Sequence, residues 1–271
     1  MRARGEGGGS GRARGDGHAY ESHEDDDGPR GPRRDGTMSG GLEIRPVVGI
    51  GEVRPGDDLA ALLAAAIGDL ADGDVVVVTQ KVVSKAEAQL VPIDPNDPQS
   101  KAKIVENESV RVLRRRGDLV ISETRHGFVC ANAGVDLSNV EDGWAALLPD
   151  DPDRSARRIR DGLRAQRDVS VAVVVSDTFG RVWRRGLTDV AIGCAGIRPV
   201  VDLRGTADSH GRPLEVTEVC VVDELAAAAE LVMGKATGTC AAVVRGVDPA
   251  WLGRGDVTRD VVRPAAEDLF R

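Results

Sequence analysis

Two aliphatic runs constrain the fold of this chain more than any other feature of its sequence. The segments DVVVVTQ at residues 74–80 and VSVAVVVS at 169–176 are apolar at nearly every position. We expect each to form a strand buried on both faces, because a half-exposed strand alternates apolar and polar residues. Aromatic residues make up only 3% of the chain, so its core must consist of Val, Leu, Ile and Ala, which suits a sheet covered by helices.

Further strands and helices are predicted on either side of these runs. Short apolar or β-branched segments predict strands at 42–48, 119–122, 128–134, 215–222 and 240–246. Helical patterns predict helices at 59–70, 98–116, 153–166 and 223–234, the first capped by Asp57 or Asp58 and the last ended by Gly234. The strands and helices do not alternate regularly, so we predict a mixed αβ (α+β) fold and not a Rossmann fold.

The first 40 residues differ in composition from the rest of the chain. They are rich in Gly, Arg and Asp and contain almost nothing apolar, which is typical of a disordered tail. We therefore predict a tail at 1–40, a folded domain at 41–255 and a C-terminal extension at 256–271. Met38 directly precedes the first predicted strand, and we hypothesise that translation starts there. Detection of a peptide from residues 15–30 in the native protein by mass spectrometry would contradict this.

Charge and composition argue against several classes of protein. The net charge of −8 and the pI near 5.2 disfavour a nucleic-acid-binding protein, which needs a basic face. No apolar run approaches the roughly 20 residues that cross a membrane, and the N-terminus lacks the apolar core of a signal peptide. The four cysteines form no CxxC pair, so we expect buried, reduced thiols in a cytoplasmic protein.

The strongest candidate site is the segment SDTFGRVWRRG at residues 176–186. Asp177 and Thr178 follow a buried strand, at the end where α/β enzymes hold ligands, and they offer oxygen ligands for Mg²⁺ or Mn²⁺. A glycine that lets the backbone approach a phosphate and three arginines that can neutralise phosphate oxygens come next. These residues are Gly180, Arg181, Arg184 and Arg185. The alternative is a capped turn with solvated arginines.

Two other segments carry groups that could complete such a site. AGVDLSNV contains Asp136 and Asn139, although a helix cap or turn would use the same residue types. Two separate aspartates, 136 and 177, are the minimum for a two-metal phosphate clamp. QKVVSKAEAQLV contains Lys81 and Lys85, which can hold a phosphate as point charges or form a solvated pair.

The nucleotide-binding motifs with the best-known sequences are missing. Neither GxxxxGK[ST] nor GxGxxG occurs in the chain, so we exclude a P-loop and a Rossmann dinucleotide site. The acids Glu215, Glu218, Asp223 and Glu224 are weaker candidates, because the last two also fit the first turn of a helix.

Taken in order, several segments resemble the coenzyme F420 γ-glutamyl ligases, also described as F420-0 γ-glutamyl ligases. They are VVGIGEVRPGDDLA, GDVVVVTQKVVSKAEAQLV, ANAGVDLSNV, LLPDDPDRSA, VVVSDTFGRVWRRGLTDVAIGCAG, HGRPLEVTEVCVVDELAAAAELVMGK and VVRG, which together span residues 42–250. The resemblance implies the fold of that family, with two subdomains. It also implies a reaction in which GTP converts the carboxylate of an F420 precursor into an acyl phosphate and the amine of L-glutamate displaces the phosphate, with GDP as the other product.

The resemblance further implies cofactors and an assembly. Phosphoryl transfer of this kind needs divalent metal, and the family implies Mg²⁺ or Mn²⁺, two ions in all, with K⁺ as a further candidate, and a homodimer. Some relatives carry a fused flavin-binding partner. Because this chain stops at Arg271, we expect a stand-alone ligase without flavin, a prediction that bound FMN in the purified protein would contradict.

Site residues can be transferred by motif position. The resemblance implies Asp136 and Asp177 as metal ligands and Thr178 as a ligand of a second metal. The implied nucleotide contacts are Ile50, Gly51, Glu52, Val53, Gln80, Lys85, Asn139 and the loop Met233, Gly234, Lys235, Ala236, Thr237, Gly238, Thr239 and Cys240. Arg184 and Arg185 we assign to the anionic substrate. The chain departs from the family at Gly51, where proline is usual, and at Lys235, where some members carry an acid.

Two other functions stay open. The chain could be an amide ligase that acts on a different carboxylated cofactor, or a nucleotide-binding regulatory module without turnover. The complete set of Asp136, Asp177 and Thr178 argues against the second, since a sensor does not need both metal-binding acids.

Overall fold

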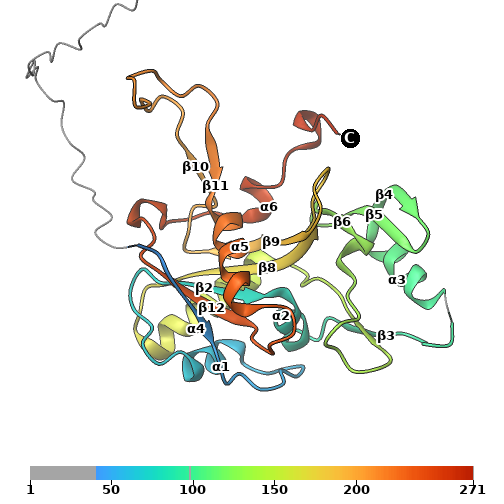
Figure 1. Ribbon diagram of the computed structural model, residues 1–271. Coiled ribbons are helices and arrows are strands. Elements are labelled where there is room, and N and C mark those ends of the chain that lie inside the picture. Colours follow the sequence, from blue (N-terminus) through green and yellow to red (C-terminus); the bar gives the residue numbers. More distant parts are fainter. Residues whose placement is uncertain (1–40, 98, 271) are drawn as a thin grey trace, which may run out of the picture. The chain divides into compact units, whose positions relative to one another are not determined.

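The computed structural model describes residues 41–97 and 99–270, so the tail predicted at 1–40 lies outside the described residues. The described residues belong to one compact unit, Met38–Arg271. Its largest sheet has five strands, in the order β1 (Glu43–Val47), β12 (Ala241–Arg245), β2 (Val75–Thr79), β8 (Ala172–Gly180) and β9 (Leu187–Ala195) (Figure 1). Strands β2 and β8 run parallel, and the other neighbours in this sheet are antiparallel.

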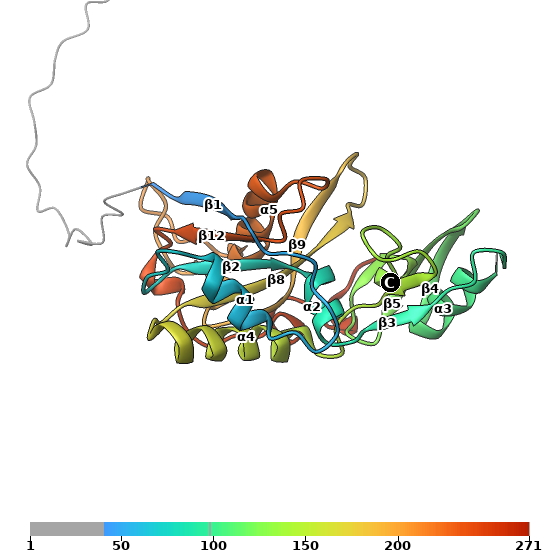
Figure 2. The same ribbon diagram turned by 90° about the horizontal axis from the view of Figure 1, so that it is seen from below.

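Helices cover both faces of this sheet. Helices α1 (Leu59–Ala66) and α4 (Pro152–Arg167) pack on one face and α5 (Val221–Met233) on the other (Figure 2). Asp58 caps α1, as predicted, by accepting a hydrogen bond of 3.1 Å from Ala61 N. The two helices on the first face approach closely, because a Cβ atom at Gly162 would lie 2.5 Å from Ala60 Cβ. The mixed αβ fold is confirmed.

The two aliphatic runs form the centre of the core, as predicted. Each residue from Val75 to Val78 is fully buried, as is each from Val173 to Val175. Leu63 of α1, Leu163 of α4 and Leu225 of α5 pack in the same cluster. All four cysteines are free; Cys130 and Cys194 are buried, while Cys220 and Cys240 are half-buried.

A smaller group of elements has its own apolar cluster. Strands β4 (Ser109–Arg116), β5 (Leu119–Thr124) and β6 (Val129–Ala131) form an antiparallel sheet beside α3 (Ser100–Glu108), and β3 (Leu90–Pro92) pairs with β7 (Trp144–Ala146). The cluster consists of Val105, Val120, Val135, Ala145 and Leu147. The remaining elements are α2 (Gln80–Ala86), β10 (Val200–Asp202), β11 (Glu218–Cys220), α6 (Val257–Asp260) and the 3-10 turns Asn132–Gly134, Pro249–Trp251 and Ala265–Glu267. Within the described residues, no helix is long and apolar enough to cross a bilayer.

Several predicted elements were wrong in part. The helix predicted at 59–70 ends at Ala66, and the strand predicted at 128–134 is confined to Val129–Ala131 because a 3-10 turn follows at Asn132–Gly134. The helix predicted at 98–116 ends at Glu108, and β4 follows, because the β-branched Val110 and Val112 alternate with polar residues and the segment pairs with β5, Val112 opposite Ser122. The strand predicted at 215–222 is confined to Glu218–Cys220, since α5 already begins at Val221. The helix end predicted at Gly234 is confirmed, with Gly234 as the C-cap at φ 62°.

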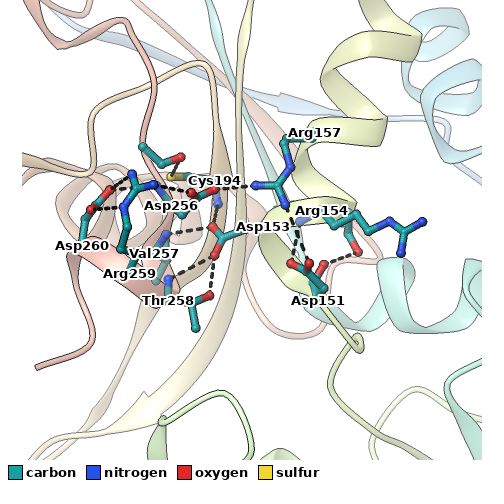
Figure 3. Close-up of polar contacts among 12 residues, drawn as sticks. Asp151, Asp153, Arg154, Arg157, Cys194, Asp256, Val257, Thr258, Arg259 and Asp260 are labelled. Carbon is teal, nitrogen blue, oxygen red and sulfur yellow. Dashed lines mark hydrogen bonds and ion pairs between the residues drawn. The ribbon is translucent and has the colours of Figure 1, made fainter. Parts of the chain in front are cut away.

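A buried carboxylate ties the C-terminal helix to the main sheet (Figure 3). Asp153, in the first turn of α4, accepts hydrogen bonds of 2.8 Å from both Cys194 N and Val257 N, and it also accepts from the backbone and hydroxyl of Thr258. Around it, Arg157 contacts Asp256, and Arg259 pairs with Asp256 and Asp260. The helix α6 is therefore held by a carboxyl group whose acceptor capacity is fully used.

Candidate functional site

The candidate site lies where the parallel strands of the main sheet end. Strand β2 ends at Thr79 and α2 begins at once with Gln80, while Thr79 pairs with Ser176 of β8. Asp177 is thus the first β8 residue beyond the parallel pairing, and it remains in the strand because β9 pairs with it at Val190. The carboxyl ends of parallel strands are where open αβ sheets hold their ligands.

A cavity of about 420 Å³ opens at this edge of the sheet. Most of the predicted site residues line it, namely Ile50, Gly51, Glu52, Val53, Gln80, Lys85, Asn139, Asp136, Asp177, Thr178, Gly234, Lys235, Ala236, Gly238, Thr239 and Cys240. An adjoining cavity of about 400 Å³ shares Asp136, Asn139, Asp177, Thr178 and Lys235. Segments that lie far apart in the sequence therefore meet in one place, as predicted.

Asp136 is held in place by backbone and by a lysine. Its backbone N and O exchange hydrogen bonds of 3.0 and 2.8 Å with Ala146. Its carboxylate accepts from Ser138 N at 2.7 Å and lies 2.8 Å from Lys81 Nζ. Desolvation raises the pKa of Asp136, but the hydrogen bonds from Lys81 and Ser138 and the lysine charge oppose it more strongly, so the pKa lies below its usual value. Asp136 is an ionised carboxylate at neutral pH.

Asp177 has the opposite electrostatic environment. Burial raises the pKa of its carboxyl to about 7, opposed by a hydrogen bond of 2.8 Å from Thr178 N and reinforced by the negative charges of Asp136 and Asp189. The charge of Lys81, which pairs with Asp136, offsets these effects only in part, and among the described residues Asp177 forms no ion pair of its own. A bound positive charge between Asp136 and Asp177 would relieve this repulsion.

A second polar cluster lies on the other side of Thr178. Thr178 Oγ1 donates to Asp189 Oδ1 at 2.7 Å, and Lys235 Nζ lies 2.6 Å from each of these two oxygen atoms. Glu230 Oε1 is 3.4 Å from the same ammonium. The Asp189 side chain is only 2% exposed, so its charge is balanced inside the protein by Lys235.

Helix α2 presents the remaining cation to the cavity. Lys85 Nζ contacts Glu52 Oε1 of the turn at residues 50–53. The helix itself is anchored from the opposite side, because Gln80 Nε2 and Ser84 Oγ donate to Leu147 O at 2.8 and 2.6 Å. The side-chain amide nitrogen of Gln80 thus donates to both Leu147 O and Ser84 Oγ, while Gln80 also lines the cavity.

Six predicted site residues do not line either cavity, namely Gly180, Arg181, Arg184, Arg185, Met233 and Thr237. Met233 is 1% exposed and belongs to the core, and Thr237 Oγ1 donates to Met233 O inside the loop. Arg184 and Arg185 are exposed in the turn between β8 and β9, next to the exposed Trp183. Their exposure is compatible with solvated arginines and with contact to a bound anion, so their assignment to the anionic substrate stays a prediction.

Three further residues belong to the site. Lys81 bridges Asp136 and Ser138 Oγ. The sequence predicted Lys81 only as one of two lysines that could bind a phosphate. Asp189 and Glu230 were missed. An acid inside the apolar run LTDVAIGCA, at residues 187–195, was a usable signal for Asp189, since a buried carboxylate needs a partner. Glu230 gave no such signal, because it is an ordinary residue of an Ala-rich helix.

Among the described residues, no group of three or more His, Cys, Asp or Glu side chains converges in a way that could hold a metal alone. Asp136 and Asp177 supply two carboxylates to one cavity. Magnesium and manganese are commonly bound by one or two carboxylates together with substrate oxygens. The site therefore suits an ion that is completed by a bound anion.

Comparison with known proteins identifies the family. The sequence profile described as F420-0:Gamma-glutamyl ligase matches residues 48–246 of the chain. This chain belongs to the F420-0:gamma-glutamyl ligase family. Its members form carbon–nitrogen bonds, which fits a site that gathers acids and lysines at the end of a sheet.

Individual relatives agree with this assignment. The chain is 42% identical, over 85% of its length and 99% of the relative, to the coenzyme F420:L-glutamate ligase of Methanothermobacter thermautotrophicus. It is 43% identical, over 85% of its length and 98% of the relative, to the protein of the same name from Methanopyrus kandleri. The corresponding protein of Archaeoglobus fulgidus is 39% identical over 85% of this chain and 96% of its own. The similarity therefore extends over nearly the whole length of these relatives.

Proposed function

We propose that this protein catalyses the GTP-dependent addition of L-glutamate to a precursor of coenzyme F420. The γ-phosphoryl group of GTP passes to the terminal carboxylate of the precursor, which gives an acyl phosphate and GDP. The amine of glutamate, after losing a proton, attacks the acyl carbon; the amide bond of the γ-glutamyl product forms and phosphate leaves. No covalent bond to the protein is needed, which agrees with a cavity lined by acids and lysines.

The observation that carries this proposal is the meeting of Asp136 and Asp177 in one cavity with two lysines. Lys81 and Lys85 are each fixed by a carboxylate, Asp136 and Glu52 respectively. Fixed cations are what a triphosphate needs, because phosphoryl transfer depends on positioning and on neutralising charge. The relatives at 42% and 43% identity are named coenzyme F420:L-glutamate ligases, which supplies the substrate class.

A divalent ion fits the carboxylate pair. Asp136 and Asp177 would hold Mg²⁺ or Mn²⁺, since both offer hard oxygen atoms and since burial, and then the charges of Asp136 and Asp189, raise the pKa of Asp177 to about 7, an effect that a bound cation would oppose. When bound, such an ion screens the phosphate charges and stabilises the charge that develops in phosphoryl transfer.

The chain's own residues bind and orient the substrates. Lys81 and Lys85 attract the phosphate oxygens, and their amines are held by hydrogen bonds, so little side-chain freedom is lost on binding. The turn at residues 50–53 and the Gly-containing loop at 234–240 line the same cavity and let backbone approach the nucleotide. A homodimer, a potassium requirement and the absence of flavin also remain part of this proposal.

Phosphate release and product mass test the proposal together. Purified protein is incubated with GTP, L-glutamate, F420 precursor and Mn²⁺, and the expected result is equimolar release of phosphate and formation of the glutamylated product. ATP in place of GTP, omission of the precursor, and removal of the metal serve as controls. Phosphate release that does not depend on the precursor would favour a different acceptor, and no turnover with bound GTP would favour a regulatory module.

A further inference from the structure

Lys235 lies inside a cluster of oxygen atoms that would otherwise suit a metal ion. Its Nζ is 2.6 Å from Thr178 Oγ1, 2.6 Å from Asp189 Oδ1 and 3.4 Å from Glu230 Oε1. These oxygen atoms come from β8, β9 and α5, so three elements of the fold converge on one ammonium group. Hard oxygen atoms of this kind bind either an ammonium group or a small divalent cation.

A second divalent ion does not fit beside Thr178. The hydroxyl of Thr178 already donates to Asp189 Oδ1 at 2.7 Å and contacts Lys235. An ion at this oxygen would lie next to the ammonium of Lys235, and the repulsion between two cations at contact distance is large where water is partly excluded. Of the two ions expected, the one at Asp136 and Asp177 therefore stays a prediction, and the one at Thr178 does not fit the residues present.

The two sides of the cavity differ in how their acids are neutralised. Asp189 is buried and carries a direct ion pair with Lys235. Asp177 accepts its described hydrogen bond from the backbone of Thr178 and lines the same cavity as Asp136. Lys235 thus neutralises Asp189 on one side, whereas on the other side Lys81 pairs with Asp136 and, among the described residues, Asp177 forms no ion pair of its own.

We propose that the ammonium of Lys235 replaces a second metal ion, so that the protein works with one divalent cation per chain. The Lys235 side chain is 52% exposed and lines both cavities, so its ammonium can contact a phosphate oxygen while Asp189 and Glu230 hold it. This inference rests on the proposed function only in taking the bound anion to be the triphosphate of a nucleotide. The number of ions can be measured without turnover.

The experiment counts Mn²⁺ ions by electron paramagnetic resonance of the free ion. Wild type, Lys235→Glu and Lys235→Gln are titrated with Mn²⁺ alone and with a non-hydrolysable imido analogue of GTP. We expect one ion per chain in wild type and one additional ion in each variant, because removing the ammonium frees the oxygen atoms of Thr178, Asp189 and Glu230. Lys103→Glu, which makes the same charge change at an exposed ion pair with Asp97, should leave the count at one.

Two ions in wild type would overturn the proposal, and so would an unchanged count in both variants at position 235. Lys235→Gln should also weaken binding of the analogue roughly 10- to 100-fold at low Mn²⁺, the loss expected for one charge-assisted contact. Unchanged affinity would show that Lys235 does not reach the nucleotide, which also overturns the proposal. If wild type ligates no glutamate, the proposed function fails while the ion counts still decide this inference.

Discussion

Two aspartates of this protein, Asp153 and Asp177, differ in what surrounds them: Asp153 is buried, whereas Asp177 is half-buried and lines two cavities. Asp153 accepts hydrogen bonds from three residues, two of them through buried backbone amides (Figure 3). Asp177 accepts from its neighbour Thr178 and faces two other carboxylates, which together with burial raise its pKa to about 7. A carboxylate whose oxygen atoms are all hydrogen-bonded stabilises a fold, whereas one with free acceptor positions can bind a cation. The predictions below test that distinction.

The largest effect is expected from Asp177→Asn. The amide keeps the shape of the side chain but lacks the charge that would hold a divalent ion, so kcat should fall by about 1000-fold or more. The free energy of unfolding should stay constant or rise, because a desolvated carboxyl group is unfavourable. Glutamate ligation and urea denaturation measure the two quantities, with Asp161→Asn, at an exposed ion pair, as the control. A large loss of stability would show that Asp177, like Asp153, serves to stabilise the fold.

Asp153→Ala should show the reverse pattern. Cys194 N and Val257 N lose their acceptor, and a buried amide without a partner is costly, so we expect the free energy of unfolding to drop by about 3 kcal/mol. Turnover per folded molecule should be preserved, since Asp153 lines neither of the two cavities at the site. Urea denaturation and kinetics at a permissive temperature check both points, with Asp161→Ala as the control. Lost turnover in fully folded protein would contradict the structural role.

Lys85→Met should weaken substrate binding without unfolding the protein. Its ammonium faces the cavity beside Glu52, and Glu52 is 66% exposed, so the remaining carboxylate would be solvated. We expect the KM for GTP to rise roughly 10- to 100-fold, with little change in the midpoint of urea denaturation. Lys103→Met, on the exposed face of α3, is the matched control. An unchanged KM would remove Lys85 from the nucleotide site.

The smallest effect concerns pH. Burial, and then the charge of Arg125, hold the pKa of His126 below its ordinary value of 6.5. As the pH falls, the unfolded chain therefore binds a proton at His126 at a higher pH than the folded protein does. The stability that neutral His126 contributes is present above pH 6.5 and is lost as the pH falls below this value. The slope is at most about 1.4 kcal/mol per pH unit.

Asp177 acts in the opposite sense. Its raised pKa makes the folded protein bind more protons than the unfolded chain between pH 4 and 7, so this contribution falls as the pH rises. The His126 contribution is therefore read as a difference between wild type and His126→Gln in urea denaturation from pH 5 to 8. A difference that does not change with pH would show that His126 titrates equally in both states.

Part of this fold could be predicted from the sequence alone. The Val runs at 75–78 and 173–175 left no other arrangement than a doubly covered sheet, and Asp58 and Gly234 marked the ends of their helices. The segment at 109–116 could not be assigned in the same way. Its four arginines suit a helix as well as an exposed strand, and the pairing with β5 decides the outcome.

The site shows the same division. Asp136 and Asp177 were predicted from acids placed after strands, and they do share one cavity. The role of Lys235 could not be predicted, because it depends on Asp189 and Glu230, which lie 46 and 5 residues away in the chain and meet only in the folded protein. The position of Arg184 and Arg185 also depends on folding, since β8 continues to Gly180 and carries both arginines into an exposed turn.

The anchoring of helix α2 has a consequence for how the site responds to its substrates. Gln80 and Ser84 bind Leu147 O, and the adjacent Ala146 exchanges both backbone hydrogen bonds with Asp136. Two of the charged groups at the cavity, Lys85 on the helix and Asp136 on its own segment, are therefore joined through residues 146 and 147 to the same framework. Their relative position is therefore set by the fold, so that little conformational entropy would remain to be lost if phosphates bind between them as proposed.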